Sequence, residues 1–233
     1  MSLYLAFDVY GTLIDTAGVT AALRGFVGER AGAFAQTWRD RQLEYSFRRA
    51  LMQDYAPFGA CIAQALDHTC AAFDVKLGSE DRDSLLGLYR CLPAFSDANE
   101  GLAALATLPV HCFAFSNGHP EDLNSLLTCS GLIGFMEGIV SLFDVRTYKP
   151  NPAAYAYFHR AAGTGGAETW LISSNPFDVI GAVASGMRAL WLRRSPQAIF
   201  DPWEYRPTAT ASTLLEVAAF LGRRLHTESG PAA

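Results

Sequence analysis

The first residue of this chain that could do chemistry is Asp8. It directly follows the apolar run Leu3–Phe7, and the residues after it, which include Tyr10 and Thr12, contain no second acid before Asp15. A lone carboxylate can attack carbon or phosphorus and form a covalent intermediate. An alkoxide leaving group would also need a proton, and Tyr10 stands where a second acid could supply it. A halide leaves without a proton, so the motif favours attack on carbon.

Two further motifs could bind an anion or supply a positive charge. Ser116, Asn117 and Gly118 follow the apolar run Val110–Phe115. A hydroxyl and free backbone N–H groups beside a helix N-terminus suit a small anion such as a carboxylate, although this tripeptide on its own is a common turn. Lys149, taken alone, is typical of a surface residue. Its position relative to the other motifs is what indicates that it could supply a positive charge to the site.

The last motif is the segment Ser173–Asp178, which again follows an apolar run. It contributes one amide and one carboxylate, at Asn175 and Asp178. Hard cations such as Mg²⁺ need several oxygen ligands, and Asp8 is the only other acid at these expected strand ends. We therefore expect a site without a metal ion and without a cofactor.

These polar residues need a scaffold that brings them together. Short apolar runs, each followed by polar or turn residues and mostly by a helical pattern, recur along the chain, and we expect them to be buried strands. They are Leu3–Phe7, Val110–Phe115, Gly138–Leu142, Thr169–Ile172 and Ala189–Leu192. Alternating strands and helices predict an α/β fold, a Rossmann-like parallel sheet with helices on both faces. Such sheets bind ligands at the carboxyl ends of their strands, where Asp8 would lie.

One long interval breaks the alternation of strands and helices. Between Val19 and Ala94, apolar residues fall at three- and four-residue spacings, which predicts helices. We expect residues 15–96 to form an all-helical cap subdomain inserted between residues 1–14 and 97–225 of the core domain, and residues 226–233 to form a disordered tail. Arg39 lies in a locally basic stretch of this insertion, which composition alone would assign to a solvated helix face.

Composition excludes several classes of function. The formal net charge of −5 over 233 residues leaves no basic face for nucleic acid. No run approaches the roughly 20 apolar residues of a membrane-spanning helix, and the first residues lack the basic segment of a signal peptide. The 5 cysteines are scattered without CxxC spacing, which argues against a zinc site or a disulfide framework. We expect a reduced, cytoplasmic protein that binds neither nucleic acid nor membranes.

Taken together, the motifs resemble the haloacid dehalogenase superfamily, and most closely the L-2-haloacid dehalogenases, from Phe7 to about Gly186. Phosphatases of the superfamily share several of these residues, so the more specific features are Tyr10 in place of a second acid, Arg39 within the segment 38–46, and the Ser173–Asp178 motif. The resemblance implies catalytic roles for Asp8, Thr12, Arg39, Ser116, Lys149, Tyr155, Ser173, Asn175 and Asp178. It implies substrate or halide contacts for Tyr10, Arg39, Ser116, Asn117 and Phe177.

The resemblance also implies a mechanism. Asp8, activated by Lys149, would displace halide from C2 of a short (S)-2-haloalkanoic acid, and water would hydrolyse the resulting ester to an (R)-2-hydroxy acid, with inversion at C2. Arg39 would hold the departing halide, and either Asp178 or Lys149 would activate the water. The family further implies a homodimer.

Three alternatives stay open from the sequence. A related metal-independent hydrolase could open another activated 2-substituted carboxylate, such as a small ring. A Mg²⁺-dependent phosphatase is disfavoured by Tyr10, and by the lack of an acidic pair in Ser173–Asp178. A binding protein on a scaffold that has lost catalysis is disfavoured because every matched catalytic position is filled.

Overall fold

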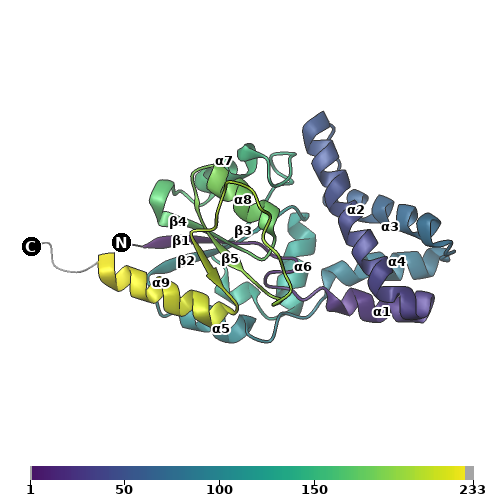
Figure 1. Cartoon of the computed structure of the whole chain (residues 1–233), viewed down its shortest axis with the longest axis horizontal. Coiled ribbons are helices and arrows are strands. Elements are labelled where there is room, and N and C mark those ends of the chain that lie inside the picture. The colour runs from purple at the N-terminus through teal and green to yellow at the C-terminus, as the bar shows by residue number, and fades with distance from the viewer. Residues whose placement is uncertain (1, 229–233) are drawn as a thin grey trace, which may run out of the picture.

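The computed structural model describes residues 2–228, and its centre is a parallel β-sheet (Figure 1). Within these residues the sheet has six strands in the order β3-β2-β1-β4-β5-β6, and every neighbouring pair is parallel. The strands are β1 (Leu3–Phe7), β2 (Val110–Ser116), β3 (Gly138–Ser141), β4 (Thr169–Ser173), β5 (Arg188–Leu192) and β6 (Ala209–Ala211). The order places β1 between the two halves of the sheet, at the point where ligands bind in open α/β sheets.

Helices cover both faces of the sheet. Leu3, Leu5 and Phe7 of β1 pack in a core that includes α5 (Ala98–Leu105), α6 (Pro120–Cys129) and α9 (Leu214–Glu228). Ala6 faces the other way, into a second core with α7 (Pro152–Ala161) and α8 (Pro176–Ala184). Since both faces are buried, the strands are apolar almost throughout, which is why the sequence revealed them. The predicted α/β fold is confirmed.

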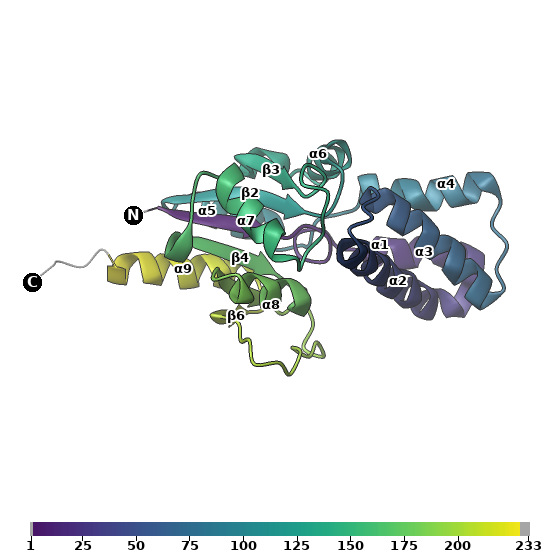
Figure 2. The same ribbon diagram turned by 90° about the horizontal axis from the view of Figure 1, so that it is seen from above.

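A helical body lies beyond the carboxyl ends of the strands (Figures 1 and 2). It consists of α1 (Ala17–Val27), α2 (Ala31–Met52), α3 (Phe58–Phe73) and α4 (Ser79–Gly87). Short 3-10 turns occur at η1 (Gly28–Arg30) and η2 (Leu88–Arg90) in this body, and at η3 (Ile133–Phe135) and η4 (Gly166–Glu168) in the core. We refer to α1–α4 and η2 as the cap.

Two linkers that run side by side join the cap to the core. Ile14 and Ala94 form an antiparallel bridge. The N–H of Asp15 donates to the carbonyl of Pro93 at 2.8 Å, and the N–H of Phe95 donates to the carbonyl of Leu13 at 3.0 Å. The chain therefore leaves and re-enters the core at one place.

One strand was not expected, and the expected C-terminal tail is helical in part. The short strand β6, Ala209–Ala211, was not anticipated. The residues expected to form a disordered tail, 226–233, divide between the last turn of α9, which ends at Glu228, and residues 229–233, which lie outside the described part of the chain.

The expectation of unpaired cysteines is wrong for two of them. Cys91, which follows η2, and Cys129, at the end of α6, form a disulfide with their Cα atoms 5.5 Å apart. The pair is separated by 38 residues in sequence and is brought together only by the packing of the cap linker on the core, so spacing could not reveal it. Cys61, Cys70 and Cys112 are free. A cytoplasmic location stays a prediction, and such a bond is rare in that compartment.

Within residues 2–228, no helix combines the length and the apolar character needed to span a membrane.

Candidate active site

The candidate site lies where the carboxyl ends of β1, β2 and β4 meet the cap. Asp8 follows β1, and its N–H continues the sheet by donating to the carbonyl of Ile172 at 3.0 Å. The chain then turns sharply at Gly11, whose φ of +80° is a conformation that favours glycine. The strand thus delivers a nearly buried carboxylate to the sheet edge, and the turn directs the chain away from it.

The two oxygens of the Asp8 carboxylate have different surroundings. Oδ2 accepts from the Thr12 hydroxyl at 2.8 Å, from Asn175 Nδ2 at 2.7 Å and from the Ser173 hydroxyl at 3.4 Å. Within the described residues, Oδ1 has one donor, Lys149 Nζ, at 3.2 Å. One oxygen is therefore held firmly by three neutral donors, whereas the other is left freer beside a positive charge.

Lys149 lies between two carboxylates and is almost completely buried. Its Nζ donates to Asp178 Oδ2 at 2.8 Å, to the carbonyl of Phe115 at 2.8 Å and to Asp8 Oδ1. All three hydrogens of the ammonium group therefore have acceptors, which offsets the cost of burying this charge. The ammonium group lies between Asp8 and Asp178, where a metal ion that bridged the two carboxylates would have to bind.

Asp178 is fully buried at the start of α8. Burial raises the pKa of Asp178 to about 6, with a smaller increase from the nearby Asp8 charge, while Lys149 and a hydrogen bond from Tyr155 oppose the shift. The Tyr155 hydroxyl donates to Asp178 Oδ1 at 2.9 Å. The carboxylate of Asp178 is thus positioned by groups on two other segments and can exchange a proton near neutral pH.

The Ser116–Gly118 turn forms the wall of the site next to β2. The Ser116 hydroxyl accepts from the N–H of Gly118 at 3.2 Å, so this N–H is already satisfied. Asn117 Oδ1 accepts from the N–H of Lys149 at 3.0 Å, which ties the turn to the lysine segment. Helix α6 begins just beyond, at Pro120, and its first turn is capped by His119.

A small cavity of about 20 Å³, room for about one water molecule, lies among these groups under the cap. The core contributes its lining from Asp8, Tyr10, Ser116, Asn117, Lys149, Asn175 and Phe177. The cap contributes Arg39 and Leu43 from α2 and Phe58 from α3. Within residues 2–228 the Arg39 guanidinium has no hydrogen bond or ion pair, so its donors are available to an anion in the cavity.

The structure brings all the predicted site residues together, and most of them lie in the cavity lining or are bonded to a lining residue. Thr12 and Ser173 donate to Asp8, and Asp178 accepts from Lys149, so these three belong to the second group. Tyr155 lies one step further out, because its hydroxyl bonds Asp178. Their chemical roles stay predictions.

Tyr10 lines the cavity, but its hydroxyl is already engaged. It donates to the carbonyl of Tyr89 at 3.2 Å. Burial raises the pKa of Tyr10, so the phenol stays protonated and neutral. A group with a raised pKa and an occupied hydrogen is a poor acid for a leaving alkoxide.

Sequence reasoning missed several residues that shape the site. Leu43 and Phe58 line the cavity from the cap. Arg194 donates to the carbonyl of Thr12 through Nε at 3.0 Å and Nη2 at 2.7 Å, and it pairs with both oxygens of Asp97. Ser174 bonds both the Thr12 hydroxyl and the carbonyl of Gly11. Ser174 lies within a recognised motif, and Arg194 follows the predicted strand Ala189–Leu192, so its position after a strand could have indicated it.

Among the residues that the structure describes, no group of three or more His, Cys, Asp or Glu side chains could hold a metal ion. In this site the two acids, Asp8 and Asp178, both face the Lys149 ammonium group.

Comparison with known proteins gives consistent matches over most of the chain. The family described as haloacid dehalogenase-like hydrolase matches residues 4–186. An (S)-2-haloacid dehalogenase of Xanthobacter autotrophicus is 36% identical over 83% of this chain and 76% of its own length. Haloacetate dehalogenase H-2 of Moraxella sp. (strain B) is 33% identical over 90% of this chain and 93% of its own.

A solved structure of such a dehalogenase has the same overall fold over most of its length. The L-2-haloacid dehalogenase from Xanthobacter autotrophicus with chloropropionic acid covalently bound has a TM-score of 0.87 and 28% identity, covering 95% of this chain and 99% of that one. With its parallel sheet and its aspartate at the end of β1, the chain belongs to the haloacid dehalogenase-like hydrolase family. It is a hydrolase that acts on carbon–halide bonds.

Proposed function

We propose that the chain hydrolyses short (S)-2-haloalkanoic acids to (R)-2-hydroxy acids through an ester on Asp8. The observation that carries this proposal is the asymmetry of the Asp8 carboxylate, with three donors on Oδ2 and only Lys149 on Oδ1. An oxygen with few hydrogen bonds keeps its nucleophilicity, and the nearby ammonium offsets the charge repulsion between this carboxylate and an anionic substrate.

In the first step, Asp8 Oδ1 attacks C2 of the substrate from the side opposite the halogen. The new C–O bond forms as the C–halogen bond breaks, and the halide departs with the bonding electron pair, which inverts C2. Ser116 binds the substrate carboxylate. Arg39, Asn117 and Phe177 also line the cavity, and they bind the halide. Because charge develops on the halide only as it leaves, Arg39 acts mainly in the transition state.

In the second step, water attacks the carbonyl carbon of the aspartyl ester. Negative charge then develops on Oδ2, where Thr12, Ser173 and Asn175 already donate, so these three side chains form an oxyanion hole. Asp178, directly or through Lys149, accepts the proton of the water. Collapse of the intermediate breaks the bond to the product oxygen, which takes the proton held by Asp178. The new Asp8 carboxyl group loses the remaining proton of the water to solvent, which regenerates the carboxylate.

Heavy-oxygen water tests this mechanism. A single turnover of (S)-2-chloropropionate in H₂¹⁸O should place ¹⁸O in Asp8, detected by mass spectrometry of the peptide that contains it, and none in the lactate. The Asp8→Asn variant should release no chloride. Asp40→Asn, an exposed change on α2, is the matched control and should keep full activity. Label that enters lactate in the first turnover, with none in Asp8, would contradict an ester intermediate.

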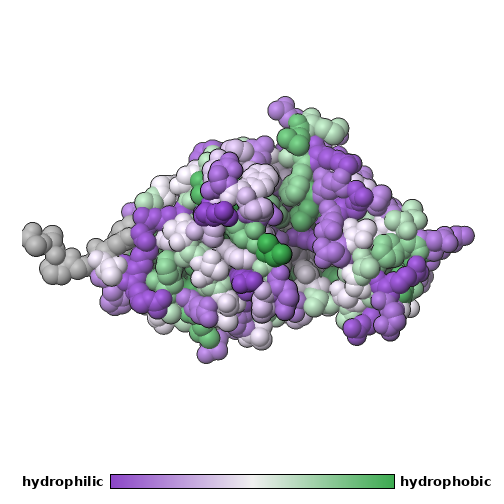
Figure 3. Space-filling view, viewed as in Figure 1, coloured by the Kyte–Doolittle hydropathy of each residue, from purple (hydrophilic) through white to green (hydrophobic). Residues whose placement is uncertain are grey.

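We further propose that the protein is a homodimer. Support comes from the end of α2, which projects beyond the rest of the molecule and exposes Leu51 by 85% and Met52 by 68% (Figure 3). Exposed apolar side chains that lie together often mark a protein contact. Light scattering at micromolar concentration should give twice the chain mass, and Leu51→Glu should reduce it. A wild-type mass of one chain would refute the dimer.

A further inference from the structure

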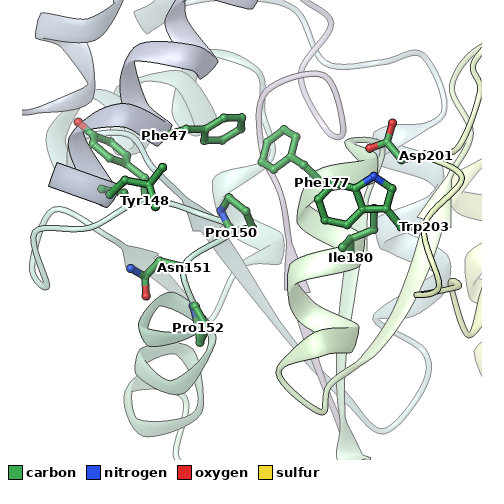
Figure 4. Close-up of a pocket in the computed structure, with 11 residues that line it drawn as sticks. Phe47, Tyr148, Pro150, Asn151, Pro152, Phe177, Ile180, Asp201 and Trp203 are labelled. Atoms are coloured by element: carbon green, nitrogen blue, oxygen red, sulfur yellow. The ribbon is translucent and has the colours of Figure 1, made fainter. Parts of the chain in front are cut away.

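A second, larger cavity lies beside the catalytic one, between the cap and the core (Figure 4). Its volume is about 550 Å³, within the range of small-molecule sites, and its wall is almost entirely apolar. The lining includes Phe47 and Ala50 from α2, Tyr148 and Pro150 from the lysine segment, and Phe177 and Ile180 from α8. None of the chemistry described above uses this space.

The two cavities share one wall, the ring of Phe177. Phe177 lines both of them, and its ring packs edge-on against Phe47 with the ring centroids 5.1 Å apart and an interplanar angle of 70°. Figure 4 shows the two rings facing each other across the space between α2 and α8. Since Phe177 is the residue that lines both cavities, a displacement of its side chain would join them.

The catalytic cavity itself has little room for a substituent on C2. Three aromatic residues line it, Tyr10, Phe58 and Phe177, and the Tyr10 hydroxyl is held by the carbonyl of Tyr89. Behind Phe58 lies a cavity of only about 70 Å³, whose wall carries the charged pair Arg90 and Asp122. Behind Phe177 lies the apolar cavity of about 550 Å³. A hydrocarbon substituent therefore has a favourable place on the Phe177 side.

We propose that this second cavity binds the alkyl tail of medium-chain 2-haloalkanoic acids, such as 2-halohexanoic and 2-halooctanoic acids, and so extends the proposed substrates beyond short chains. The inference rests on the proposed function, since the carboxylate and C2 must stay beside Ser116 and Asp8. Asp201 lies at the edge of the cavity and disfavours a second carboxylate on the tail, so the occupant is a plain hydrocarbon. Burial of a methylene group favours binding by about fourfold, so the specificity constant rises with chain length.

The test is a chain-length series of (S)-2-bromopropionate, (S)-2-bromohexanoate and (S)-2-bromooctanoate, with kcat/KM measured by bromide release. The wild-type enzyme should favour the octanoate over the propionate by at least about tenfold. Ala50→Phe, which places a ring in the cavity, should lower the octanoate-to-propionate ratio by about tenfold or more. Ala33→Phe, the same change at an exposed position of the same helix outside the cavity, should leave this ratio unchanged.

A second variant keeps the test valid if Ala50→Phe does not fold. Trp203 is 57% exposed and forms part of the cavity wall, so Trp203→Ala should fold and should lower the ratio severalfold. A wild-type preference for propionate over octanoate would overturn the proposal. So would an Ala50→Phe variant with a changed mass in light scattering and an unchanged ratio, which would make the cavity a subunit contact. No bromide from 2-bromopropionate would instead refute the proposed function.

Discussion

The hydrogen bond between Tyr155 and Asp178 offers the sharpest test of the site. Replacing Tyr155 by Phe removes the donor to Asp178 Oδ1 and keeps the ring, which packs against Phe115 with centroids 6.0 Å apart. A hydrogen bond to a charged group contributes about 1.5–3 kcal/mol. At about 1.36 kcal/mol per pKa unit, losing it raises the pKa of Asp178 by about 1–2 units. Starting from about 6, the new pKa lies at about 7–8.

The sign of the effect on activity follows from the role of the carboxylate. Asp178 accepts a proton only when ionised, so activity is present above its pKa and is lost as the pH falls through it. The acid limb of kcat should lie near pH 6 in the wild type and move upward by about 1–2 units in Tyr155→Phe. The measurement is chloride release from saturating (S)-2-chloropropionate across the pH range, because kcat includes ester hydrolysis.

A matched control lies on the same helix. Tyr157 is two residues further along α7, and its hydroxyl donates to Asp144 at the surface, at 2.9 Å. Tyr157→Phe removes a hydroxyl and a hydrogen bond to a carboxylate without touching Asp178, so its acid limb should not move. An unmoved limb in Tyr155→Phe, or a limb displaced to lower pH, would refute the reasoning that burial and hydrogen bonding set this pKa.

Three further predictions concern the cap, its attachment and the packing of the site. Arg39→Lys should lower kcat by about 10²- to 10³-fold, measured as single-turnover halide release, and a loss below tenfold would argue against a halide contact. Cys91→Ser removes the crosslink to α6 and should lower the free energy of unfolding by about 2–4 kcal/mol in urea titrations without reductant; equal stabilities would contradict this. Gly181→Ala places a Cβ 2.3 Å from the Tyr155 hydroxyl, so it should displace that hydroxyl, cost about 1–3 kcal/mol of stability and reduce kcat. Gly134→Ala has nothing within 4 Å of its new Cβ and serves as the control, and equal effects of the two changes would show that crowding is not the cause.

The sheet could be predicted because of how it is buried. Strands covered on both faces are apolar at most positions, so β1, β2 and β4 stand out from the helices around them. The edge strand β6 has only three residues, and its middle residue, Thr210, is exposed. It is stabilised by pairing with β5 rather than by its own composition, which leaves no pattern to detect.

The candidate site was predictable to the extent that its residues follow strands. Asp8, Ser116 and the Ser173–Asp178 segment all end strands of one parallel sheet, so topology alone brings them to one edge. Arg194 follows β5 of the same sheet and obeys the same rule, although the sequence analysis did not use it. Phe58 reaches the site through the packing of the cap on the core, and nothing in its local sequence indicates this. Cys91 and Cys129 likewise meet only through the packing of segments that are distant in sequence, so their pairing could not be predicted.

The fastening of the cap differs along its boundary with the core. Next to α6, the cap is joined to the core by the Cys91–Cys129 bond and by the ion pair of Arg90 with Asp122, at 2.7 Å. Next to the lysine segment, the Tyr148 hydroxyl donates to the carbonyl of Ala56, between α2 and α3. Next to α8, the contact is between the rings of Phe47 and Phe177, with no covalent bond. Separating the cap from the core should cost least free energy at α8, so we expect small molecules to enter and leave there.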